Sequence, residues 1–182
     1  MVIDGIDYGP IGHLVGSWEG EGLDVAPNPV DTTEENEFYD KLFFEAIGTV
    51  TNANMQTLSA IYYRHRVYSK KSGNGFHDQT GYFLYDPASK MVVHTFNIPR
   101  GVNILAIGKA KGSEPIELEL STNEQGGGIL QTPFMANKAK TTSYTMQLSI
   151  YKDKLSYKQT TMLEIYNNNF THIDESILKR VD

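Results

Sequence analysis

Short segments in which apolar and polar residues alternate recur along most of the chain. Residues 116–120 (Ile-Glu-Leu-Glu-Leu) are the clearest case, with an apolar side chain at every second position. This period of two is typical of a β-strand that buries one face. Only short connections and no helix of normal length separate the segments, which favours antiparallel neighbours over strand–helix–strand units. We therefore predict an all-β fold, an antiparallel up-and-down β-barrel of about ten strands, with residues 1–182 as a single domain.

The alternation also predicts where the strands lie. In chain order they are residues 37–50, 55–68, 76–85, 91–97, 102–110, 116–120, 141–151 and 154–165. Asn74-Gly75 predicts a tight hairpin turn after the second of them. Residues 25–35 are polar and carry prolines, so we interpret them as a loop. Residues 121–139 lack periodicity and contain three consecutive glycines, and we expect a flexible flap of the kind that often borders a ligand site.

The only tryptophan, Trp18, lies in the glycine-rich segment Gly16-Ser-Trp-Glu-Gly-Glu-Gly22. Glycine within a strand marks a bend or a close approach of two backbones. The spacing of these glycines matches no phosphate-binding pattern. With residues 10–15 as one helical turn before it, we predict a curved first strand whose Trp18 closes one end of the barrel.

Composition excludes several classes of partner. The net charge of −6 and the pI of about 5.3 disfavour nucleic acid and anionic membrane surfaces, both of which attract basic proteins. No run of apolar residues is long enough for a membrane span. The first residues show no basic region followed by an apolar core, so we expect no secretory signal. The chain has no cysteine, which excludes disulfides and thiolate metal sites and fits a cytoplasmic location.

A barrel of this size has room inside for one small ligand, and the last predicted strand offers a residue to bind it. His172 lies in residues 170–180, where apolar side chains are expected to dock the chain end and turn the imidazole inward. These anchors are Phe170, Ile173, Ile177 and Leu178. From the residues alone, a hydrogen-bonded or exposed histidine is a commoner role than a metal ligand.

Four segments, in this order along the chain, resemble motifs of the nitrobindins, heme-binding β-barrels similar in shape to lipocalins and fatty-acid-binding proteins. They are Leu14-Val-Gly-Ser-Trp-Glu-Gly-Glu-Gly22, His77-Asp-Gln-Thr-Gly-Tyr82, Ile116-Glu-Leu-Glu-Leu-Ser-Thr122 with Leu155-Ser-Tyr157, and the chain end with His172, Ile173, Ile177 and Lys179. Where the family continues the first motif with Tyr-Pro, this chain has Asp24-Val-Ala-Pro-Asn-Pro29.

The resemblance implies a ferric heme b cofactor whose iron takes His172 as axial ligand, and imidazole is a standard donor to heme iron. It places His77 in the cavity wall, Ile98 at the open ligand side and Met162 at the pocket. It also implies that the protein handles nitric oxide or isomerises peroxynitrite to nitrate. Whether the chain is an enzyme is left open; if it is one, it would be a heme-dependent peroxynitrite isomerase. A homodimer is a further expectation.

The residues leave one other function open, a heme-free carrier of a small apolar or fatty-acid-like ligand. Arg64, Arg66 or Arg100 would then pair with the ligand's carboxylate. A conventional hydrolase has little support, because the sequence shows neither a nucleophile elbow nor paired carboxylates at a suggestive spacing.

Overall fold

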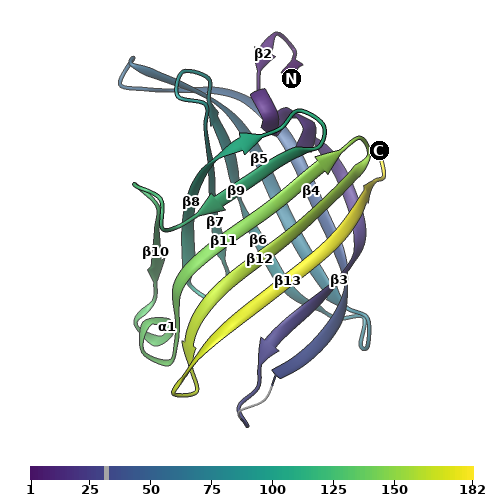
Figure 1. Cartoon of the computed structure of the whole chain (residues 1–182), viewed down its shortest axis with the longest axis vertical. Helices are drawn as coiled ribbons and strands as arrows, with labels where there is room; N and C mark the ends of the chain where they lie inside the picture. The colour runs from purple at the N-terminus through teal and green to yellow at the C-terminus, as the bar shows by residue number, and fades with distance from the viewer. Residues whose placement is uncertain (31–32) are drawn as a thin grey trace.

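The structure is a computed structural model that describes residues 1–30 and 33–182 (Figure 1). Its long strands are β3 (Gly16–Pro27), β4 (Thr33–Asn52), β5 (Gln56–Ser69), β6 (Gly75–Asp86), β7 (Met91–Ile98), β8 (Val102–Lys111), β11 (Ala139–Tyr151), β12 (Lys154–Ile165) and β13 (Asn168–Arg180). The shorter elements are the strands β1 (Val2–Ile3), β2 (Ile6–Asp7), β9 (Ile116–Ser121) and β10 (Gly128–Gln131), the 3-10 helix η1 (Gly9–Leu14) and the α-helix α1 (Pro133–Lys138).

The long strands form one closed antiparallel barrel. Neighbours in sequence pair with each other from β3 to β8 and again from β11 to β13. β13 pairs with β3, which brings the last long strand beside the first (Figure 1). β9 pairs with both β8 and β11 and so closes the sheet. β10 pairs with a different part of β8. Counted together as one strand of the barrel wall, the short β9 and β10 bring the nine long strands to ten. The predicted all-β, up-and-down barrel is confirmed.

The segment predicted as a flexible flap, residues 121–139, contains regular structure instead. It holds β10 and α1, and Thr132 caps α1 because its Oγ1 accepts a hydrogen bond from Met135 N at 3.4 Å. The side-chain amide of Gln131 extends the barrel wall: its Nε2 donates to Thr141 O at 2.8 Å, and its Oε1 accepts from Thr141 N at 2.9 Å. These local hydrogen bonds order a segment that has no hydrophobic period.

One further expectation about a connection is corrected, and a second is confirmed in place but differs in detail. β3 runs through Pro27 and β4 begins at Thr33, so much of the loop predicted at residues 25–35 is strand, and residues 31 and 32 of that prediction lie outside the described residues. The hairpin turn between β5 and β6 is where the sequence predicted it. Gly73, however, takes the positive φ of 71°, whereas Gly75 already starts β6.

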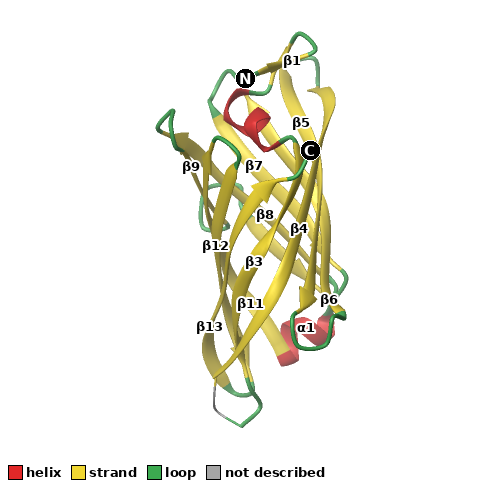
Figure 2. Cartoon of the chain, turned by 90° about the vertical axis from the view of Figure 1, so that its right-hand side faces the viewer, coloured by secondary structure: helices red, strands yellow, loops and turns green. Residues whose placement is uncertain are grey.

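Trp18 lies in the core at the end of the barrel that carries η1, as predicted, and contacts Leu14 at the end of that helix. Its side chain is fully buried, and its Nε1 donates a hydrogen bond to Leu14 O at 2.7 Å. The Arg180 guanidinium lies 4.2 Å from the ring centroid, in reach of a cation–π contact. The same half of the barrel is filled by apolar side chains, among them Ile11, Leu14, Phe44, Ile61, Phe83 and Leu178. This half therefore forms the packed core, and α1 lies at the opposite end (Figure 2).

None of the helices in the described part of the chain has the length and apolar character needed to span a bilayer.

We predict that Trp18→Ala lowers the free energy of unfolding by about 3–5 kcal/mol, because a large buried side chain leaves a cavity behind. Chemical denaturation followed by circular dichroism measures this loss without needing the tryptophan signal. Tyr151→Ala is the control, since Tyr151 is 43% exposed and its removal is expected to cost about 0.5 kcal/mol or less. Equal denaturation midpoints for the wild type and Trp18→Ala would contradict the role of Trp18 as a plug.

Candidate functional site

The half of the barrel away from η1 encloses a cavity of about 530 Å³. This volume falls in the range of about 300–1,000 Å³ that is usual for small-molecule sites. Much of its wall is apolar, with Phe38, Val67, Phe96, Ile98, Ile104 and Leu163 among the lining residues. Met135 and Ala139 also line it, so the segment predicted as a flap does border this space. The barrel therefore has one solid half and one half able to hold a ligand.

Three of the four site residues predicted from the sequence line this cavity. His172 comes from β13, His77 from β6 and Ile98 from the end of β7. The last strand is anchored differently from the prediction, because Leu178 is fully buried whereas Ile177 is 57% exposed. Its inward face nevertheless carries His172, as expected.

Met162 does not line the cavity, and its predicted place at the pocket is corrected. Its neighbours Thr161 and Leu163 both line the cavity, so the alternation of β12 turns the intervening side chain to the outer face. There Thr171 Oγ1 donates a hydrogen bond to Met162 Sδ at 3.4 Å.

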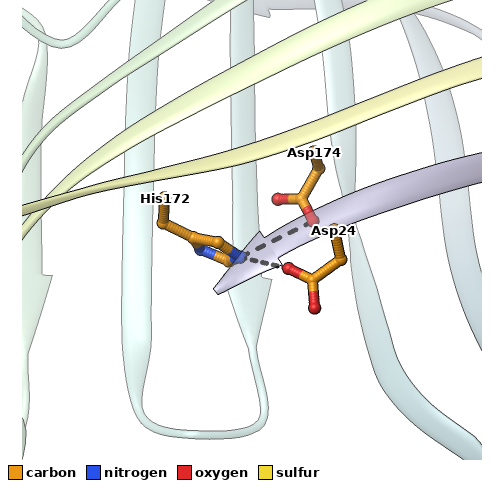
Figure 3. Close-up of side chains that lie close together, drawn as sticks. All are labelled: Asp24, His172 and Asp174. Atoms are coloured by element: carbon orange, nitrogen blue, oxygen red, sulfur yellow. Dashed lines mark hydrogen bonds and ion pairs between the residues drawn. The ribbon is translucent and has the colours of Figure 1, made fainter. Parts of the chain in front are cut away.

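His172 does not stand alone in the wall. Its Nε2 lies 2.6 Å from Asp24 Oδ1 and 3.7 Å from Asp174 Oδ1 (Figure 3). The second oxygen of Asp24 accepts a hydrogen bond from Asn36 Nδ2 at 3.1 Å. The Asp24 side chain is 8% exposed, whereas those of His172 and Asp174 are each 27% exposed. The imidazole is thus held from one side by a buried carboxylate.

Strand register brings these three residues together. His172 and Asp174 are two positions apart on β13 and so point to the same face. Asp24 lies directly opposite Asp174 in the pairing of β3 with β13. Like charges at directly opposed positions repel each other, and this pair is destabilising unless a cation or a proton compensates it.

The pKa values follow from this crowding. Burial lowers the pKa of His172, but the hydrogen bond with Asp24 and the charge of Asp174 outweigh it, so the pKa of His172 lies above its usual value. Burial raises the pKa of Asp174 to about 6; the nearby His172 opposes this rise and the charge of Asp24 adds to it. The two carboxylates therefore favour the protonated form of the imidazole.

The donor atoms suit two kinds of metal centre. One ligand atom from each of Asp24, His172 and Asp174 lies within 4.8 Å of the others, which is compact enough for a single ion. The imidazole alone can also act as an axial ligand. Asp24 occupies Nε2, and Nδ1 has no hydrogen-bond partner among the residues that the structure describes. A carboxylate on one ring nitrogen and a metal on the other is the usual arrangement of a metal-binding histidine.

A second polar group lies deeper in the wall. His65 Nε2 is 2.7 Å from Asp40 Oδ1, and Tyr157 Oη donates to Asp40 Oδ2 at 2.6 Å. β3 contributes only Gly20 and Gly22 to the inner face here, which leaves room for Tyr157 to reach across to Asp40. Burial raises the pKa of Asp40, but His65 and the hydrogen bonds outweigh it, so the pKa of Asp40 lies below its usual value.

His77 adjoins this group on the neighbouring strand, with its ring centroid 5.6 Å from that of His65. Its Nε2 lies 3.0 Å from Gln79 Oε1, and burial lowers the pKa of His77 to about 4. His77 is therefore neutral at physiological pH and forms a polar part of the wall. Within the described chain, the buried His65 Nδ1 and Tyr144 Oη lack hydrogen-bond partners, and both residues line the cavity.

Sequence reasoning missed the carboxylates of this site. Asp24 and His172 are 148 positions apart and share no local motif. The one signal was indirect: Asp24 begins the stretch that departs from the Tyr-Pro of the nitrobindin pattern. The sequence shows no carboxylate pair at a suggestive spacing, and Asp24 and Asp174 are paired only through the register of β3 with β13.

Comparisons with known proteins agree with this architecture. A family model described as a THAP4-like, heme-binding beta-barrel domain matches residues 7–180. Among solved structures, the crystal structure of Rv2717c from M. tuberculosis matches with a TM-score of 0.73 and 23% sequence identity. That match covers 94% of this chain and 95% of the other, and it shows a shared fold. No curated protein sequence matches the chain.

We predict that Asp24→Asn lowers the pKa of His172, because it removes the hydrogen bond and the charge that raise it. NMR titration of the histidine ring signals measures the change. Asp153→Asn is the control: Asp153 contacts Arg180 at 3.3 Å, away from the cavity, and its loss should leave His172 unchanged. A His172 pKa that is the same in Asp24→Asn and in the wild type would contradict the pairing.

Proposed function

The chain belongs to the family of THAP4-like, heme-binding β-barrel domains, in keeping with its resemblance to the nitrobindins, and on this premise we propose that it binds ferric heme b in the barrel cavity. His172 is the proposed axial ligand of the iron. The observation that carries the proposal is an imidazole in the cavity wall, fixed by a buried carboxylate through one ring nitrogen.

The residues of the cavity fit such a group. Its largely apolar wall suits the faces of a flat macrocycle, and its volume of about 530 Å³ is that of a small-molecule site. The donor set also fits, because Asp24 holds Nε2 and leaves Nδ1 for a metal. We therefore assign Nδ1 as the coordinating atom, with Asp24 orienting the ring.

A bound heme would supply an iron centre able to take a small oxidant or gas as its further ligand. The chain's own part is to orient His172 and to provide the polar wall across the barrel. β3 and β4 separate β13 from β5, so His65 and His77 approach the cavity from a different side than His172 does. We propose on the family resemblance that the ligand chemistry concerns nitric oxide or the isomerisation of peroxynitrite to nitrate.

The heme-free carrier is the second candidate, and one observation favours it. Among the described residues that line the largely apolar cavity there is a single arginine, Arg100, which suits an apolar ligand with an acidic end. Arg64 is not available for that role, since it pairs with Asp78 at the barrel surface. Arg66 lies on the outer face, because its neighbours His65 and Val67 line the cavity. The homodimer and the cytoplasmic location stay predictions.

We predict that His172→Ala abolishes hemin binding or weakens it strongly, because the axial bond is lost while the barrel stays folded. Hemin titration followed by absorbance in the Soret region measures the affinity, and circular dichroism checks the fold. His77→Ala is the matched control and should bind hemin nearly as well as the wild type. Equal hemin affinity of the wild type and His172→Ala would sink the proposal and favour the carrier.

We further predict that Asp24→Asn weakens hemin binding by about 10–100-fold, the usual effect of losing the carboxylate that orients a metal-binding histidine. The same titration measures it, with Asp153→Asn as the control. Tighter binding by Asp24→Asn would contradict coordination through Nδ1, because it would mean that the iron competes with Asp24 for Nε2.

A further inference from the structure

We propose that Arg100 is the anchor for the carboxylate groups of the ligand, and that it fixes the ligand with its acidic end at the cavity mouth. The inference rests on the proposed binding of a porphyrin. It assigns recognition of the porphyrin's carboxylate groups to Arg100, a residue separate from the proposed iron ligand His172.

The turn between β7 and β8 presents Arg100 at the cavity. Gly101 N donates to Ile98 O at 3.0 Å, which closes a four-residue turn with Pro99 at its second position, where proline is favoured. Thr132 N donates to Gly101 O at 2.9 Å and ties this turn to the N-cap residue of α1. The backbone that carries Arg100 is thus held in place from two sides.

The charges around the cavity single out Arg100. It is the only lysine or arginine among the described residues that line the space, whereas Asp24, Glu34 and Asp174 all contribute carboxylates. Arg100, His77 and His172 all line the same cavity, so an acidic group of a ligand bound there would share that space with the guanidinium.

Arg100 also has no salt-bridge partner in the part of the chain that the structure describes. Across residues 1–30 and 33–182, no carboxylate lies within salt-bridge distance of it, in contrast to Arg64 and Arg180. A guanidinium presents a planar fork of donors that matches a carboxylate. Arg100 at the cavity mouth and the carboxylates beside His172 favour the same orientation of the ligand. Arg100 attracts an acidic group to the rim, whereas Asp24 and Asp174 repel it from the interior.

The test uses protoporphyrin IX, which has no iron, and its dimethyl ester, which has no free carboxylate. Binding of each to the wild type, Arg100→Gln and Arg66→Gln is measured by porphyrin fluorescence. Arg66 is the matched control, an exposed arginine on the outer face of β5. Because the porphyrin has no iron, the result does not depend on His172 as a metal ligand.

We expect the wild type to bind the diacid about three- to tenfold tighter than the ester, the scale of an exposed ion pair. Arg100→Gln should lose this preference by binding the diacid more weakly, while Arg66→Gln keeps it. The preference should also shrink as the salt concentration rises.

Equal binding of the two porphyrins by the wild type, or an unchanged preference in Arg100→Gln, would overturn the inference, as would failure of the wild type to bind either porphyrin. The hemin titration of His172→Ala is independent of this outcome. A preference for the diacid together with a His172→Ala protein that binds hemin normally would leave Arg100 as the anchor and remove His172 as the iron ligand.

Discussion

The pairing of β3 with β13 is the interaction on which the rest of the molecule depends. It joins the first and last long strands and so completes the ring of strands. The same register places Trp18 opposite Arg180 at the solid end of the barrel and Asp24 opposite Asp174 at the hollow end. A slip of one residue would turn each of these side chains to the other face, so closure, plug and site are specified together.

The site contains an electrostatic repulsion between two carboxylates that the fold itself does not require. Two carboxylates face each other across β3 and β13, and burial together with Asp24 raises the pKa of Asp174 to about 6 even though His172 opposes the rise. Such conflicts are commoner at functional sites than in structural cores, because perturbed groups are what binding and catalysis use. His172 relieves the conflict in the free protein, and the same contact with Asp24 orients the ring that is proposed to bind iron.

The sequence predicted those parts of the molecule whose structure is decided by residues adjacent in the chain. Alternation located β4 to β8, β11 and β12, and the isolated Trp18 among glycines indicated the plug. It missed β10 and α1, which depend on the Thr132 cap and on the amide of Gln131 rather than on a hydrophobic period. The apolar residues of the chain end pointed to an inward His172, and the resemblance gave its role as a ligand. Asp24 was missed, since its place depends on the register of two strands from opposite ends of the chain. Met162 was assigned to the pocket by resemblance alone, although the alternation of β12 turns it outward.

In the proposed complex, a porphyrin occupies the cavity with its iron on His172 Nδ1 while Nε2 stays hydrogen-bonded to Asp24. A crystal structure of the protein with bound hemin tests it most directly. We expect porphyrin density between β13 and the histidine-bearing wall of β5 and β6, an iron–Nδ1 bond and an intact contact between Nε2 and Asp24. Iron bound to another residue, or hemin located outside the barrel, would contradict it.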